Sequence, residues 1–174
     1  MDNKIRLLFV EDNEDDALLM ENELRRNLPD FYHRQVDSLE ALESSLTESD
    51  WDIILSDYNL NGFNIHSVID LLKHKRLDIP LIVVSGAVGE DVAVELMKLG
   101  ARDYIMKGKW YRLAPAIKRE LNEVRLREKK RQSDKAFQNS EKRFKTLTDL
   151  APVGIYQANV SGDFVYVNDR WTKM

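Results

Sequence analysis

The stretch KIRLLFVEDNEDD, from Lys4 to Asp16, places a short apolar run directly before a series of acidic residues. The run Leu7–Val10 has the length and composition of a buried strand, and carboxylates follow it at once. Asn13 is a suitable N-cap for a helix over residues 14–27, because acidic residues in the first turn interact favourably with the helix dipole. This stretch therefore predicts a strand, a loop rich in carboxylates, and a helix.

The same alternation of strand and helix continues to about residue 112. The expected strands cover residues 4–10, 31–36, 51–56, 81–85 and 102–106. The expected helices cover residues 14–27, 38–47, 63–76 and 90–99, and a last helix begins near Lys109. Central strands that are apolar on both faces indicate a parallel sheet covered by helices on both sides, which is an α/β doubly wound fold.

Reactive side chains follow the predicted strands of this sheet. Glu11 and Asp12 follow the first strand, Asp57 the third, Ser85 ends the fourth, and Lys107 follows the fifth. In doubly wound sheets the ligand site lies beyond these carboxyl ends. Three carboxylates in one cleft repel one another unless a cation neutralises them, and their oxygens suit Mg²⁺. A carboxylate facing a metal ion and a lysine is equipped to attack phosphorus and form an acyl phosphate.

Four segments carry a resemblance to the receiver domain of two-component response regulators. In chain order they are VEDNEDD (10–16), LSDYNLNGF (55–63), IVVSGAVGE (82–90) and GARDYIMKG (100–108). The resemblance covers residues 4–112 and implies a flavodoxin-like, five-stranded parallel sheet with strand order 2-1-3-4-5. It also implies a phosphorelay in which a histidine kinase or a phosphotransfer protein donates a phosphoryl group from a phosphohistidine.

The resemblance further assigns roles to single residues. Asp57 is implied to be the phosphoacceptor, and Lys107 to contact a phosphoryl oxygen. Asp12 and Asp57 are implied to bind Mg²⁺ directly, with Glu11 acting mainly through water. The backbone carbonyl of Asn59 is implied to be a further metal ligand.

A conformational switch is implied by two other residues. Ser85 would form a hydrogen bond to the phosphoryl group, and Tyr104 would turn inward when that hydroxyl moves. The readout surface would then be the helix over 90–99, the strand over 102–106 and the last helix. The family usually has proline at the positions of Gly108 and Asn61, and these departures affect the rigidity of the switch rather than a reacting group.

Other interpretations of the acidic loop are open. Glu14, Asp15 and Asp16 are read as acids that stabilise the start of a helix. An aspartate-nucleophile phosphatase of the haloacid-dehalogenase type would place a D-x-D arrangement after the first strand, which Asp12 and Glu14 match only approximately. A dimerisation module that is never phosphorylated is a third reading.

Composition and charge narrow the class of protein. Residues 117–148 hold 11 basic and 5 acidic residues, whereas the rest of the 174-residue chain carries a net charge of −10. The acidic part is a poor match for nucleic acid, and the basic stretch fits a solvated helix, so no nucleic-acid partner is predicted. No apolar run approaches the roughly 20 residues of a membrane span, and no signal peptide is recognised. With no cysteine in the chain, a reducing cytoplasm is the expected compartment. The three histidines, His33, His66 and His74, are expected to face solvent and not to accept phosphate.

The chain beyond residue 112 predicts a connector and a second module. The last helix carries an apolar stripe at helical spacing, made of Leu113, Ile117, Leu121 and Val124. This stripe could pack on the sheet or on a second chain, so a homodimer through the last helix and the linker is a hypothesis. The next segment is polar all round, and residues 140–174 resemble the opening of a PAS domain, with a hairpin over 155–158 and 164–167.

The predicted organisation is a receiver domain over 1–126, a helical linker over 127–139 and an incomplete PAS α+β segment over 140–174. This order resembles the start of larger signalling proteins such as hybrid histidine kinases, although the chain itself contains no kinase motif. Because a lone hairpin is marginally stable in water, residues 152–174 are expected to be poorly ordered or packed on a neighbour.

Overall fold

The computed structural model describes residues 4–28, 30–86 and 89–173, and its centre is a five-stranded parallel sheet. The strands lie in the order β2-β1-β3-β6-β7. They are β1 (Ile5–Val10), β2 (Phe31–Val36), β3 (Ile53–Asp57), β6 (Leu81–Ser85) and β7 (Asp103–Met106). The predicted flavodoxin-like, doubly wound topology is confirmed, with β6 and β7 as the fourth and fifth strands of that sheet.

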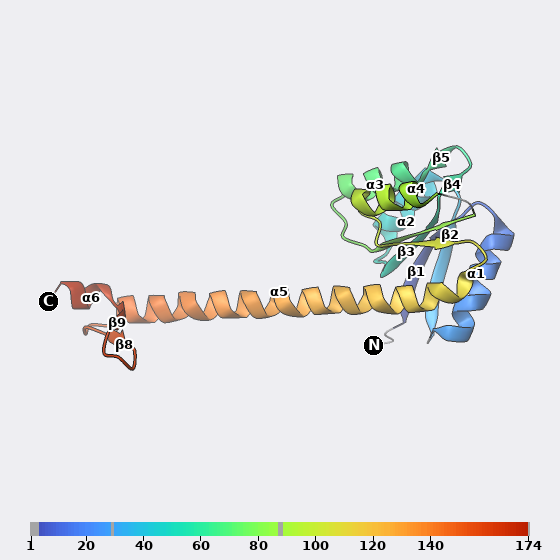
Figure 1. Cartoon of the computed structure of the whole chain (residues 1–174). Helices are drawn as coiled ribbons and strands as arrows, with labels where there is room; N and C mark the ends of the chain where they lie inside the picture. Colours follow the sequence, from blue (N-terminus) through green and yellow to red (C-terminus); the bar gives the residue numbers. More distant parts are fainter. Residues whose placement is uncertain (1–3, 29, 87–88, 174) are drawn as a thin grey trace. The chain divides into compact units, whose positions relative to one another are not determined.

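Helices cover both faces of the sheet (Figure 1). They are α1 (Glu14–Asn27), α2 (Leu39–Glu48), α3 (Ile65–His74), α4 (Glu90–Leu99), the 3₁₀ turn η1 (Trp110–Arg112) and α5 (Leu113–Leu150). The first turns of α5 and the apolar side of α1 pack on one face, where Leu113 and Ile117 are fully buried. The helices α2, α3 and α4 pack on the other face.

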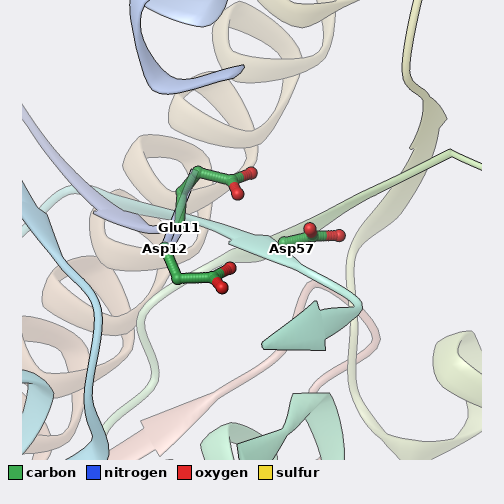
Figure 2. A group of neighbouring side chains, drawn as sticks. All are labelled: Glu11, Asp12 and Asp57. Atoms are coloured by element: carbon green, nitrogen blue, oxygen red, sulfur yellow. The ribbon is translucent and has the colours of Figure 1, made fainter. Parts of the chain in front are cut away.

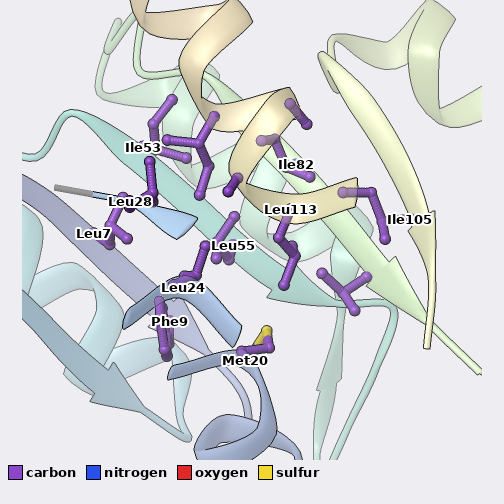
Figure 3. Packing of buried hydrophobic residues seen from close by; sticks show 14 of the residues in the cluster. Leu7, Phe9, Met20, Leu24, Leu28, Ile53, Leu55, Ile82, Ile105 and Leu113 are labelled. Carbon is purple, nitrogen blue, oxygen red and sulfur yellow. The ribbon is translucent and has the colours of Figure 1, made fainter. Parts of the chain in front are cut away.

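The two cores follow from the alternation of side chains along the strands. In β1, Leu7 and Phe9 enter the cluster under α1 and α5, while Leu8 and Val10 enter the cluster on the opposite face (Figure 3). All four side chains are fully buried. Burial of a large apolar side chain contributes about 1.5–3 kcal/mol, so a strand that is apolar on both faces is stable only between two helical layers.

Local signals place the start of α1 and the end of α4 where the sequence predicts them. The side chain of Asn13 caps α1 by accepting hydrogen bonds from the backbone N–H groups of Asp15 at 2.9 Å and Asp16 at 3.2 Å. Gly100 ends α4 with a φ of 120°, a left-handed conformation that glycine adopts without the cost of a Cβ.

The segment after β3 differs from the prediction. A short antiparallel hairpin, β4 (Asn59–Leu60) and β5 (Phe63–Asn64), turns at Gly62, whose φ is 85°. The helix α3 consequently begins at Ile65, with Asn64 as its N-cap, and not at Phe63. Strands of two residues leave no recognisable period in a sequence, and this explains the missed hairpin.

The chain divides into two compact units, residues 1–123 and 124–174. In the second unit the rest of α5 is followed by β8 (Tyr156–Ala158), β9 (Phe164–Val167) and the short helix α6 (Asp169–Thr172). The predicted hairpin is present, with β8 and β9 antiparallel. Whether residues 152–174 pack on a neighbour stays a prediction. Among the described residues, no helix is both long and apolar enough to cross a membrane.

Candidate functional site

Three carboxylates meet at the carboxyl edge of the sheet. Glu11 and Asp12 follow β1, and Asp57 is the last residue of β3 (Figure 2). One oxygen of each carboxylate lies within 4.8 Å of the others. Glu11 is fully buried, Asp57 is 7% exposed, and Asp12 is half-buried. The sequence prediction that the strand ends bring these three residues together is therefore correct.

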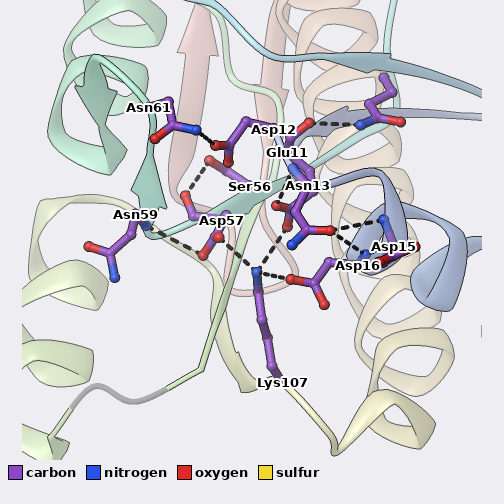
Figure 4. A network of polar contacts seen from close by, with 11 residues as sticks. Glu11, Asp12, Asn13, Asp15, Asp16, Ser56, Asp57, Asn59, Asn61 and Lys107 are labelled. Atoms are coloured by element: carbon purple, nitrogen blue, oxygen red, sulfur yellow. Dashed lines mark hydrogen bonds and ion pairs between the residues drawn. The ribbon is translucent and has the colours of Figure 1, made fainter.

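Lys107 reaches into this group from the end of β7. Its Nζ lies 2.7 Å from Asp57 Oδ2, 2.7 Å from Asp16 Oδ2 and 3.2 Å from Glu11 Oε2 (Figure 4). Burial of the ammonium lowers its pKa, but the hydrogen bonds to Asp16 and Asp57 and the charges of Glu11 and Asp57 together outweigh burial and raise the pKa above the ordinary value for lysine. Lys107 therefore keeps its positive charge throughout the physiological pH range.

Glu11 has an environment that disfavours its charge. Burial raises its pKa, the backbone N–H of Asn13 lowers it by donating to Oε1 at 3.1 Å, and the charge of Asp57 raises it again. The other oxygen, Oε2, accepts no hydrogen bond from the described residues, and its 3.2 Å contact with Lys107 is an ion pair without hydrogen-bond alignment. Because each carboxylate oxygen has two lone pairs, Oε2 can accept a further partner beside the ammonium.

Two asparagines from the loop after β3 contact the carboxylates. The backbone N–H of Asn59 lies 3.4 Å from Asp57 Oδ1, and the side-chain amide of Asn61 donates a hydrogen bond to Asp12 Oδ2. Sequence comparison marked Asn61 only as a departure from proline. Its amide gives Asp12 a hydrogen bond that a proline side chain has no group to donate.

Two buried hydroxyls lie near the site. Ser85 Oγ is fully buried at the end of β6, and Tyr104 OH is buried in β7, and neither has a hydrogen-bond partner among the described residues. Ser85 lies one residue beyond Val84, the residue of β6 that pairs with Asp57 of β3. Buried polar groups are usually paired, so both hydroxyls have an unmet need for a partner.

Two interpretations from the sequence require correction. Asp16 does more than stabilise the start of α1, because its carboxylate turns toward Lys107. His33 does not face solvent freely: its ring stacks on Phe9 with the ring centres 4.9 Å apart, and its side chain is 24% exposed. Both contacts join residues far apart in the chain, which local patterns do not reveal.

The loop after Lys107 is built around a glycine. Gly108 has a φ of 90°, and the backbone N–H of Lys109 closes a turn by donating to the carbonyl of Met106 at 2.9 Å. The backbone N–H of Lys107 donates to the Ser85 carbonyl at 2.7 Å. Strand pairing therefore fixes the start of this loop, and glycine allows the left-handed conformation that follows.

Comparison with known proteins agrees with this geometry. The family model "Response regulator receiver domain" matches residues 7–117. The response regulator protein FleR of Pseudomonas aeruginosa is 32% identical over 72 residues, which are 41% of this chain and 15% of the length of FleR. The chain thus matches only a small part of that relative.

Solved structures show the same fold. A signal receiver domain from Vibrio parahaemolyticus has a TM-score of 0.65 at 23% identity, covering 72% of this chain and 95% of that one. The receiver domain of a Francisella response regulator has a TM-score of 0.63 at 16% identity, covering 70% and 99%. With a family model that spans most of the chain, the conclusion is that this protein belongs to the response regulator receiver domain family.

Proposed function

We propose that the chain is a phosphoacceptor receiver in two-component signal transduction, with Asp57 as the residue that is phosphorylated. The observation that carries this proposal is the contact between Asp57 Oδ2 and the Lys107 ammonium, 2.7 Å apart, beside two further carboxylates. Asp57 is the candidate that combines a nearly buried carboxylate, a permanent cation and a position at the carboxyl edge of the sheet.

The proposed step moves one phosphoryl group. A carboxylate oxygen of Asp57 attacks phosphorus and forms an O–P bond, while the N–P bond of the phosphohistidine breaks and its electron pair returns to the imidazole. The phosphohistidine carries a proton on its other ring nitrogen as it reacts, so that the histidine leaves as neutral imidazole, and Asp57 becomes an acyl phosphate. Lys107 stabilises the charge on the phosphoryl oxygens, because an ammonium near the transferring group offsets the repulsion between two anions. The donor would be a histidine kinase or a phosphotransfer protein.

Mg²⁺ fits the donor set of this site. Glu11, Asp12 and Asp57 supply hard oxygen ligands, and Oε2 of Glu11, which forms an ion pair with Lys107 at 3.2 Å, has a further lone pair for a cation or its water. Asp12 and Asp57 would hold the ion directly, Glu11 mainly through water, and the Asn59 backbone carbonyl would add a ligand. Bound there, Mg²⁺ would neutralise charge on the phosphoryl oxygens.

The switch is proposed to run through the two unpaired hydroxyls. Phosphorylation replaces one negative charge by about two and adds acceptor oxygens, which gives Ser85 Oγ a partner. Tyr104 would then move inward and alter the surface of α4, β7 and α5. We propose that the receiver domain ends at residue 126 and that this change acts through a helical linker over 127–139 on a PAS segment over 140–174. We also propose that α5 and the linker pair with those of a second copy in a homodimer.

The test is incubation of the chain with acetyl phosphate and Mg²⁺, followed by the mass of the intact protein. A receiver gains one phosphoryl group, and Asp57→Asn abolishes the gain. A phosphatase of the haloacid-dehalogenase type releases phosphate catalytically from small phosphoesters instead. A dimerisation module neither gains a phosphoryl group nor releases phosphate. Catalytic release of phosphate, or the absence of both reactions, would overturn the proposal.

A further inference from the structure

The Lys107 ammonium contacts three carboxylates, those of Asp57, Glu11 and Asp16, and of these only Asp16 lies outside the acidic cluster proposed to hold Mg²⁺. Its Nζ is 2.7 Å from Asp57 Oδ2 and equally close to Oδ2 of Asp16, a residue of the first turn of α1. The side chain of Asp16 is 24% exposed, so the ion pair is only partly screened by solvent. Lysine and aspartate are 91 residues apart in the chain, and their contact ties α1 to the loop after β7.

Asp16 is itself firmly placed. Its backbone N–H donates to the capping side chain of Asn13 at 3.2 Å, and the N–H of the next residue, Ala17, donates to the Asn13 carbonyl at 3.1 Å. Ala17 packs in the core under α1. The carboxylate of Asp16 therefore projects from a capped turn that is followed at once by a residue of the core.

Lys107 has the greater need of a support. Its side chain has four rotatable carbon–carbon bonds, and ordering such a side chain costs up to about 2 kcal/mol. The residue that follows it is Gly108, which has a φ of 90° and no side chain to pack against its neighbours. When Asp57 is phosphorylated, the negative charge that faces the ammonium moves from the carboxylate to the phosphoryl oxygens, whereas the charge of Asp16 stays in place.

We propose that Asp16 is a positioning residue that holds the Lys107 ammonium beside Asp57 before and during phosphoryl transfer. The inference rests on the proposed function for its kinetic consequence. The contact of the Asp16 carboxylate is with Lys107 and not with Asp57, so Asp16 would act through Lys107.

The experiment compares Asp16→Asn with Asp15→Asn in the full chain. Both variants remove one negative charge from the first turn of α1, but Asp15 is exposed and only its backbone N–H bonds to the Asn13 side chain. With saturating acetyl phosphate and Mg²⁺, D16N should phosphorylate about fivefold more slowly than the wild type, the size expected for loss of one partly screened ion pair. D15N should stay within about twofold, and Asp16→Glu should recover at least half of the loss.

A second readout is independent of phosphorylation. Nitrogen-detected NMR of the lysine ammonium groups in metal-free protein should show a restrained Lys107 signal in the wild type and D15N, and a mobile one in D16N. The inference is overturned if D16N matches the wild-type rate, if D15N slows equally, or if Lys107 stays equally restrained in D16N. Absence of phosphorylation in the wild type would instead refute the proposed function, and the NMR comparison would still decide the role of Asp16.

Discussion

The receiver unit (residues 1–123) and the C-terminal unit (residues 124–174) contain the same kinds of apolar residue but bury them to very different extents. Phe9 and Leu55 in the sheet are fully buried, whereas Phe164 and Val165 in the hairpin β8–β9 are 61% and 58% exposed. The sheet lies between two helical layers, while the described part of residues 124–174 has two short strands and one short helix after α5. A sheet that is packed between two helical layers holds the charged residues at its strand ends in fixed positions. The candidate site accordingly lies in the receiver unit.

The largest expected contrast is between two phenylalanines. Phe9→Ala should lower the free energy of unfolding of the receiver unit by about 3–5 kcal/mol, because it leaves a cavity in a closed core. Phe164→Ala should change it by less than about 0.5 kcal/mol, as surface substitutions usually do. Urea unfolding followed by the fluorescence of Trp51 and Trp110, in a background where Trp171 is replaced by Phe, measures both. Equal losses would break the comparison.

A smaller loss of stability is expected from a substitution at Asn168, a buried polar residue of the C-terminal unit. Asn168 is 1% exposed, and its side chain donates to the carbonyls of Thr148 at 2.6 Å and Val153 at 3.0 Å and accepts from the N–H of Ile155 at 2.8 Å. Asn168→Ala should cost about 1–3 kcal/mol of local stability.

Hydrogen exchange of the amides in β8 and β9 measures that loss, with the amides of β1 and β3 unchanged. Asn159→Ala is the matched control, since Asn159 also bonds within the hairpin but is exposed. Loss of protection in the sheet after N168A would contradict the assignment of the Asn168 hydrogen bonds to the C-terminal unit alone.

The smallest effect concerns pH and is confined to the receiver unit. Burial against Phe9 lowers the pKa of His33 below 6.5, and this outweighs the attraction of Glu21, 3.6 Å away. The unfolded chain therefore binds a proton at a higher pH than the folded one. Stability from this group is complete above about pH 6.5 and is lost as pH falls toward the folded pKa.

His33→Gln tests this dependence on pH. Between pH 7 and pH 5.5, the wild type should lose more unfolding free energy than the variant, measured by urea unfolding at each pH. An identical loss in the two proteins would show that His33 does not titrate as its burial requires.

The sheet was predictable because its signals are local. Apolar runs, the Asn13 cap and the glycine at position 100 each act within a few residues, and their positions in the structure agree with the sequence. The hairpin between β3 and α3 was not predictable from the sequence, because its strands have only two residues each. The start of α5 also shifted, because η1 takes up Trp110–Arg112 first.

The site was predictable as a set of strand-end residues and not as a network. Parallel topology alone brings Glu11, Asp12, Asp57 and Lys107 to one edge. The turn of Asp16 toward Lys107 depends on a contact between distant segments, and an acid in the first turn of a helix already has a sufficient local reason to be there. The hydrogen bond from Asn61 to Asp12 is hidden for the same reason.

The central claim is that Asp57 is the phosphoacceptor, and the most direct test locates the modified residue. After treatment with acetyl phosphate and Mg²⁺, borohydride reduction converts an aspartyl phosphate into homoserine, which peptide mass spectrometry finds by position. We predict homoserine at position 57 of the wild type and of Asp52→Asn, a control at the other end of β3 that leaves the site intact. Homoserine at another aspartate, or undiminished phosphorylation of Asp57→Asn, would contradict the account.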